Sequence, residues 1–454
     1  MASLSKINDK PDANVPKNGW LKNAVEPSLP EVFASIPVPK TGSSWRKMFA
    51  FTGPGLMIAV GYMDPGNWAT DIAGGAKFGY TLLSVILISN FFAMLLQHLS
   101  LKLGIVTGRD LAQACRDAYP RPVALALWFL AEIAIAACDL AEVLGSAIAL
   151  NLLFGMPLWL GCLLTVADVL VILFFQGRGF RMLEAIVAGL IFTIIACFGY
   201  EIAVSHPYFH EIAAGLVPRK EIVMNPEMLY LAIGILGATV MPHNLYLHSS
   251  IVQTRKIEQT TEGVRSAIKF ATIDSTASLL LAFFVNAAIL ILAAATFHKN
   301  GMNDVADITV AYRLLDPIVG AAFSSTLFAV ALLAAGQNST LTGTLAGQIV
   351  MEGFLNIRLK PWLRRLVTRL IAVVPALFVT AYYGEKGTAD LLVLSQVILS
   401  LQLSFAVIPL VSLTGNKEKM GNFVNKMWLK IAAWTVSLII ISLNVYLLVQ
   451  MSLS

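Results

Sequence analysis

The chain has 454 residues, of which 57% are hydrophobic and only 13% are charged, and its formal net charge at pH 7 is +5. Soluble globular proteins carry about 25% charged residues, so this composition excludes a soluble globular protein and indicates an integral membrane protein. The small positive charge lies in basic loops between apolar segments and gives no indication of nucleic-acid binding.

The first 45 residues are polar and are interrupted repeatedly by proline. They lack the apolar core of a signal peptide and are too polar to cross a membrane. We therefore expect residues 1–45 to form a disordered cytoplasmic tail, with a short stretch near residues 32–36 able to touch the membrane surface.

Apolar segments of about 20 residues, the length that crosses the hydrocarbon core of a bilayer, fill the rest of the chain. We predict eleven transmembrane helices. They lie at 51–75, 79–104, 123–150, 152–176, 182–204, 228–252, 270–297, 319–350, 366–383, 389–414 and 428–452. Lys and Arg concentrate in alternate loops, which places the N-terminus in the cytoplasm and, with an odd number of helices, the C-terminus outside.

Two of these segments are interrupted at equivalent places in the two halves of the chain. Segment 51–75 contains the polar run DPGN from Asp64, and segment 228–252 contains the run MPHN from Met241. In a bilayer a broken helix persists only where its freed backbone groups line an enclosed cavity or a ligand. Paired breaks of this kind predict a transporter with a central binding site built on inverted repeats.

The first break favours a cation. Asp64 lies near the middle of its segment, where an ionisable group is costly and is functional or paired by default. Pro65 and Gly66 interrupt the helix and free carbonyls such as that of Gly61. Asn67 can turn its amide oxygen toward the same point. The alternative is a simple kink with a hydrogen-bonded Asp64.

The second break adds a soft donor. Met241 offers a thioether, which binds magnesium and calcium poorly but accepts manganese, iron and the later first-row metals. Methionine in a membrane helix otherwise serves for packing. Here it adjoins Pro242, whose break frees the carbonyl of Ala238. A site of carboxylate, amide oxygen, carbonyl and thioether suits a divalent transition metal.

The two runs stand in the contexts GYMDPGNWATD and GATVMPHNLYLHSS, and further along the chain are DLAEVLG, PWLRRL and SQVILS. With these motifs, residues 45–452 resemble the natural resistance-associated macrophage protein (Nramp) family of proton-coupled divalent metal transporters. The resemblance implies an all-α integral membrane protein with a leucine-transporter-like fold and discontinuous helices 1 and 6. Two inverted five-helix repeats at 46–204 and 228–414, and an eleventh helix at 428–452, would make up a transporter domain spanning 46–452.

The resemblance also implies the metal ligands. They are the side chains of Asp64, Asn67 and Met241 and the carbonyl of Ala238, joined in some conformations by the Gly61 carbonyl and Gln396. The magnesium-transporting branch of the family lacks this methionine, so Met241 argues against it. The transported ions would be Mn²⁺ or Fe²⁺ and protons, with no permanently bound cofactor and no enzymatic activity.

Proton coupling needs ionisable groups that lead away from the metal. Glu132, Asp139 and Glu142 share one stripe of the third segment, and that stripe cannot face lipid. The resemblance implies a proton pathway from the metal site to the cytoplasm. Its members would be Asp64, Glu132, Asp139, Glu142, His243, His248, Arg364 and Arg365. The alternative is a static network of buried ion pairs.

Other readings of the sequence remain open. A sodium-coupled amino-acid symporter could share the fold, but it would not need Asp64 and Met241 to converge. An intramembrane metalloprotease would need an HExxH helix, which the sequence lacks. The roles of Asp168, Asp274 and Asn286 stay open, and one site of this kind binds both manganese and iron. Short loops indicate a bacterial plasma membrane, with lipid, metal ions and protons as partners and no obligatory protein partner.

Overall fold

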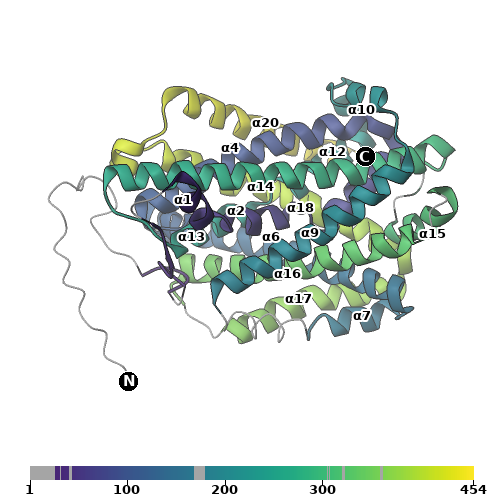
Figure 1. The fold of residues 1–454 in the computed structure, drawn as a ribbon, viewed down its shortest axis with the longest axis horizontal. Helices are drawn as coiled ribbons and strands as arrows, with labels where there is room; N and C mark the ends of the chain where they lie inside the picture. Colours follow the sequence, from purple (N-terminus) through teal and green to yellow (C-terminus); the bar gives the residue numbers. More distant parts are fainter. Residues whose placement is uncertain are drawn as a thin grey trace.

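A computed structural model describes residues 26–30, 32–39, 43–167, 179–303, 305, 307–319, 323–357 and 361–453. This part of the chain is helical apart from one short pair of strands. The long helices run along the long axis of the molecule, with α1, α2 and α13 near one end and α10 and α15 near the other (Figure 1). We call the end of the molecule that carries α1, α2 and α13 the α1 end.

The first half of the chain contains one strand and nine helical elements within the described residues. They are β1 (Ile36–Pro37), α1 (Ser44–Phe51), α2 (Pro54–Gly61), α3 (Pro65–Phe78), η2 (Gly79–Leu82), α4 (Leu83–Thr107), α5 (Leu111–Ala118), α6 (Arg121–Phe154), α7 (Leu158–Leu164) and α9 (Phe180–Ser205). Helix α7 lies in the first half of the predicted segment at 152–176. Residues 168–176 of that segment, with Asp168, lie outside the described residues.

The second half continues with helices and the second strand. Its elements are α10 (Phe209–Gly215), α11 (Glu221–Met224), α12 (Pro226–Thr239), α13 (Pro242–Ile251), η3 (Val252–Thr254), β2 (Arg255–Lys256), α14 (Thr261–Thr296), η4 (His298–Asn300), α15 (Ile308–Val319), α16 (Ser324–Leu355), α17 (Pro361–Tyr382), α18 (Gly384–Thr414), α19 (Lys417–Met420), η5 (Gly421–Phe423) and α20 (Met427–Leu453).

Seven helical runs among the described residues are long and apolar enough to cross a membrane. One of them joins α3, η2 and α4 without interruption, and another joins α12, α13 and η3. A shorter apolar helix occupies Arg369–Tyr382. The predicted membrane protein is therefore all-helical, while the number of eleven spans and the inverted repeats stay predictions.

Both predicted helix breaks are present. Helix α2 ends at Gly61 and α3 begins at Pro65, with Asp64 as the N-cap residue that accepts from the Asn67 amide at 2.8 Å. Helix α12 ends before Met241, and α13 begins at Pro242. Each new helix starts with proline, whose missing N–H would have had no partner within the helix at that position.

The broken helices lie in the centre of the bundle. Of the residues in the most apolar stretch of the run that contains α12 and α13, 94% are buried inside the protein. In α20, at the periphery, the corresponding share is 33%. Close packing at the first break depends on Gly145 of α6, because a Cβ there would lie 2.1 Å from a carbon of Pro65. The sequence thus places its least regular backbone where neighbouring helices can satisfy it.

The described part of the predicted tail is folded against this bundle. Strand β1 pairs in parallel with β2, with Ile36 opposite Arg255. Ser28, Leu29 and Ile36 are buried. Residues 26–30 and 32–39 thus contact the bundle, which buries Ser28, Leu29 and Ile36 and leaves Phe33 47% exposed. Disorder of the tail as a whole stays a prediction.

Candidate metal-binding site

The residues predicted as metal ligands lie at the two helix breaks, Asp64 and Asn67 at the first and Ala238 and Met241 at the second, and the helices that flank the breaks pack against each other. Asp64, Asn67, Ala238 and Met241 are each no more than 1% exposed. The Asp64 Oδ2 and Asn67 Oδ1 atoms have no hydrogen-bond partner among the described residues. Buried oxygens normally accept a hydrogen bond, so acceptors left open here suit a cation.

Two glycines let further polar groups reach the breaks. A Cβ on Gly66 would lie 1.8 Å from the Gln396 Nε2 atom, so this amide of α18 packs directly on the first break. A Cβ on Gly61 would lie 2.1 Å from the Asn244 Nδ2 atom. Gln396 thus lies against the first break, and Asn244 links the second break to the end of α2 at Gly61. That Gln396 and the Gly61 carbonyl bind a metal stays a prediction.

Asn244 was missed by the sequence analysis although it stands in the MPHN run. Its side chain is fully buried, and both its Oδ1 and Nδ2 atoms lack a hydrogen-bond partner among the described residues. The available signal was an amide at the third position after the methionine, matching Asn67 at the third position after Asp64.

The donor set is mixed in character. Within the described residues, no group of three or more His, Cys, Asp or Glu side chains is placed to hold a metal ion. The predicted ligand set instead combines one carboxylate with amide oxygens, a carbonyl and a thioether. Such a set has hard donors for manganese or iron and one soft donor that calcium and magnesium do not use.

Beside the metal site, two acids of α6 face an arginine. Asp139 and Glu142 are buried, and the Glu142 Oε2 atom accepts from Arg369 Nη1 at 3.1 Å. The same nitrogen lies 3.9 Å from Asp139 Oδ1, and Arg369 Nη2 donates to Thr340 Oγ1 at 2.9 Å. These groups form one buried network between α6, α16 and α17.

Cys138 connects this network to the second break. Its Sγ atom lies 3.7 Å from Glu142 Oε1 and 3.7 Å from His243 Nε2. Glu142 and His243, both predicted in the proton pathway, therefore lie on either side of one thiol. Cys138 also belongs to a small apolar cluster with Met241 and Leu399.

The basic member of the network is Arg369, which the sequence analysis did not single out. The predicted pair Arg364 and Arg365 begins α17, but their side chains lie outside the described part of the structure. Arg369 follows Arg365 by one helical turn inside an apolar segment. A basic residue inside a predicted apolar segment was the available signal. The acids that it faces follow only from the packing of α17 on α6.

Two other residues predicted in the proton pathway, Glu132 and His248, make contacts with residues other than Arg369. Glu132 is half-buried and accepts from the Trp128 indole N–H at 3.0 Å. His248 Nδ1 lies 2.9 Å from Gln97 Oε1, and Gln97 Nε2 donates to the Tyr62 hydroxyl at 2.9 Å. His248 thus connects to the first break through α4.

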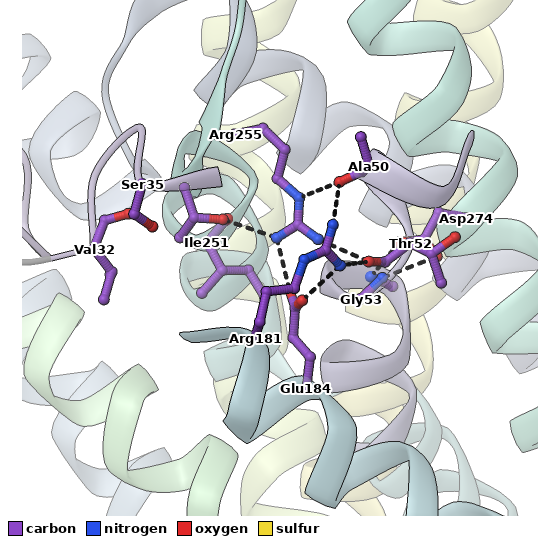
Figure 2. Close-up of polar contacts among 12 residues, drawn as sticks. Val32, Ser35, Ala50, Thr52, Gly53, Arg181, Glu184, Ile251, Arg255 and Asp274 are labelled. Atoms are coloured by element: carbon purple, nitrogen blue, oxygen red, sulfur yellow. Dashed lines mark hydrogen bonds and ion pairs between the residues drawn. The ribbon is translucent and has the colours of Figure 1, made fainter. Parts of the chain in front are cut away.

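A second polar cluster holds the junction between α1 and α2, and we call it the clamp (Figure 2). It comprises Arg181 and Glu184 of α9, Arg255 of β2, Asp274 of α14 and the backbone of residues 49–55. Arg255 Nη1 lies 2.6 Å from Glu184 Oε1, and its Nε and Nη2 donate to the carbonyls of Ala50 and Thr52 at 3.0 and 2.8 Å.

The remaining contacts of the clamp come from α9 and α14. Arg181 Nη1 donates to the Thr52 carbonyl at 2.7 Å, and Asp274 Oδ2 accepts from the Gly55 amide at 2.7 Å. Asp274, whose role the sequence left open, thus anchors the start of α2. Asn286, also left open, donates to the Tyr62 carbonyl in the first break at 2.8 Å.

Comparison with known families identifies the chain. A family model described as natural resistance-associated macrophage protein-like matches residues 55–450. The chain belongs to the Nramp family. The resemblance predicted from the two interrupted runs is therefore confirmed, and the match spans both breaks and the acidic stripe of α6.

Relatives of this Nramp protein have been described and solved. A divalent metal cation transporter, MntH, from Listeria innocua is 63% identical over 432 residues, covering 95% of this chain and 96% of the relative. The crystal structure of a manganese transporter from Eremococcus coleocola, in complex with an aromatic bis-isothiourea substituted compound, has a TM-score of 0.86 and 43% identity. The match covers 92% of this chain and 90% of the Eremococcus chain.

The Nramp fold extends to more distant transporters. A closed structure of Mhp1, a nucleobase-cation-symport-1 family transporter with bromovinylhydantoin bound, has a TM-score of 0.59 at 16% identity. It covers 92% of this chain and 93% of Mhp1. At this identity the likeness concerns the fold alone, and it identifies no substrate.

Proposed function

We propose that this Nramp chain imports divalent transition-metal ions, chiefly Mn²⁺ or Fe²⁺ and also Cd²⁺, Co²⁺ or Zn²⁺, coupled to protons by alternating access. The proposal is carried by the helix break at Asp64 and Asn67, whose buried oxygens lack hydrogen-bond partners among the described residues, and by the second break at Met241, whose flanking helices pack against those of the first. The Listeria relative is described as a divalent metal cation transporter and the Eremococcus relative as a manganese transporter, which supports a divalent metal ion as the cargo.

Each ligand has a role that follows from its chemistry. Asp64 supplies the negative charge, Asn67 and the Ala238 carbonyl supply neutral oxygens, and Met241 supplies the soft donor that disfavours calcium and magnesium. Gln396 and the Gly61 carbonyl are placed to join as the helices shift. The ions pass through as substrates, so the protein needs no permanently bound cofactor.

The proton route begins at the same carboxylate. A divalent ion favours the ionised form of Asp64, so an arriving ion displaces its proton. We assign the onward route to His243, Glu142 and Asp139, with Arg369 as their counter-charge. Glu132, His248, Arg364 and Arg365 are retained as further members of the pathway.

The proposed orientation makes the α1 end cytoplasmic. The N-terminus and the clamp lie inside, the C-terminus lies outside, and the protein resides in a bacterial plasma membrane. Eleven helices in two inverted repeats, at 46–204 and 228–414, would rock about the breaks, with the helix at 428–452 outside the repeats. Opening of the clamp would then let the ion leave toward the cytoplasm.

Two alternative functions are compatible with part of the observations. A sodium-coupled amino-acid symporter can have the same fold, but a substrate carboxylate is not attracted to a buried Asp64. A magnesium transporter would gain nothing from the thioether of Met241.

Purified protein in proteoliposomes loaded with a metal-sensitive dye tests the proposal. External Mn²⁺ should quench the dye, faster with an inward proton gradient, and magnesium should not compete. Sodium-dependent amino-acid uptake without Mn²⁺ entry would overturn the proposal in favour of the symporter.

A further inference from the structure

The α1 end of the molecule carries a groove that is filled by the protein's own N-terminal segment. The groove is formed by Asp110 and Gln113 at the start of α5 and by Gln253, Arg255 and Lys256 after α13. Residues 26–30 and 32–38 lie in it, and we call them the strap. Figure 2 includes Val32 and Ser35 of the strap near Arg255 of the clamp.

The strap is attached at both walls of the groove. On the α5 wall, Ser28 Oγ donates to Asp110 Oδ2, and Gln113 Nε2 donates to the Glu26 carbonyl at 2.8 Å. On the other wall, the Ala34 amide donates to the Gln253 carbonyl at 3.0 Å, where Ile36 and Arg255 are paired. Only Ile36 and Pro37 are extended, where they pair with β2, while residues 28–30 and 32–34 form bends and turns, with Ala34 in the left-handed region at φ 50°.

Three strap side chains are buried, and one of them is the polar Ser28. Leu29 and Ile36 are the apolar members that are buried, at 3% and 6% exposure. Proline cannot donate to a ladder of backbone hydrogen bonds, so the pairing cannot extend far past Pro37. Beyond it, residues 37–39 line an open crevice of about 1020 Å³ together with Lys47 and the start of α14. The strap is therefore held by few contacts and borders free space.

Arg255 connects the groove to the clamp. The backbone of Arg255 pairs with the strap, while its side chain holds Ala50, Thr52 and Glu184. A backbone movement of β2 that withdraws Arg255 from the α1–α2 junction would also move the strand that the strap covers. Strap docking and clamp closure therefore favour each other.

We propose that the strap is a reversible latch, docked in the groove while the clamp is closed and released when the clamp opens. This inference rests on the proposed alternating access, because it needs an arrangement in which the α1 end opens. The occupant of the groove is the strap, residues 26–30 and 32–38, and a synthetic peptide that contains them should be able to replace it.

Hydrogen–deuterium exchange of the full-length protein tests the latch. Ile36→Asp removes one apolar anchor, and Ser28→Ala removes the bond to Asp110 with little risk to folding. Both should make exchange several-fold faster at residues 49–55 and 253–256, because opening frees those amides. Ser35→Ala is the matched control, since Ser35 Oγ is exposed and bonds only within the strap, to the Val32 carbonyl at 2.7 Å.

A synthetic peptide of residues 26–39, added to the Ile36→Asp protein, should restore slow exchange at both sites. Unchanged exchange in both variants would overturn the latch, and so would a rise spread equally over α18 and α20, which would make the strap a general part of the fold. Mn²⁺ uptake by the wild-type protein is measured in parallel. Its absence would refute the proposed function, whereas normal uptake with unchanged exchange would refute the latch alone.

Discussion

Replacement of Arg369 by methionine should destabilise the protein strongly. Arg369 and Glu142 are fully buried and lie 3.1 Å apart, and the second guanidinium nitrogen is bonded to Thr340. Methionine fills a similar volume but leaves the acids of α6 without their counter-charge. Removing one partner of a buried ion pair costs about 3–5 kcal/mol, so we expect the free energy of unfolding to fall by about that amount.

A double-mutant cycle tests the coupling between Arg369 and Glu142. Glu142→Gln removes the charge that Arg369 neutralises, so the variant carrying both changes should recover about 1–3 kcal/mol relative to the sum of the single losses. Arg369→Lys should lie between wild type and methionine, because an ammonium group cannot reproduce the planar fork that reaches both Glu142 and Thr340.

A denaturant titration of helicity in detergent measures the free energy of unfolding of all five proteins: wild type, the three single variants and the double variant. Additive losses in the double variant would refute the coupling between Arg369 and Glu142. An Arg369→Met protein as stable as wild type would show that this ion pair does not stabilise the bundle at all.

Four further outcomes are expected. Asp64→Ala should abolish Mn²⁺ uptake and metal-linked proton entry in proteoliposomes while helicity stays unchanged, since the site loses its only charged ligand; wild-type uptake would contradict the assignment. Met241→Ala should keep reduced Mn²⁺ uptake but weaken Cd²⁺ most and let Ca²⁺ compete; continued exclusion of Ca²⁺ would rule out the thioether as the filter. Glu142→Gln should leave Mn²⁺ binding measurable by calorimetry but impair proton flux, and loss of binding would place Glu142 in the metal site. Burial raises the pKa of the Asp110 carboxyl, outside the membrane segments, from 3.8 to about 6, so the folded state favours the protonated form and the free energy of unfolding should fall as pH rises through that interval. Asp110→Asn should flatten this slope in melting curves, and an unchanged slope would assign it to another group.

The helix breaks were predictable because they depend on local chemistry. Proline and glycine inside an apolar segment interrupt a helix wherever that segment lies, so Pro65 and Pro242 marked the breaks without any tertiary information. The same holds for Asp64, since an acid at that depth is rarely placed without a function. Gln396 was expected only from the family resemblance, and its contact with Gly66 depends on how α18 packs.

What the sequence did not identify depends on tertiary packing. Arg364 and Arg365 were predicted as an adjacent basic pair, and their side chains lie outside the described part of the structure. Arg369 faces the acids of α6, and that contact depends on the packing of α17 on α6. The tail was predicted to be disordered because it is polar, contains repeated prolines and lacks an apolar core. The burial of Leu29 and Ile36 depends on contacts with distant parts of the chain.

The peripheral position of α20 makes it a suitable site for a probe of conformational change in the bundle. It is tied to α18 by Asn444, which exchanges hydrogen bonds with the hydroxyl and carbonyl of Ser400 at 2.9 and 2.7 Å. Ser400 is one turn beyond Gln396, the amide that packs on the first break. A fluorophore on the exposed face of α20 would therefore report on tilting of α18 without an added group in the ion's path.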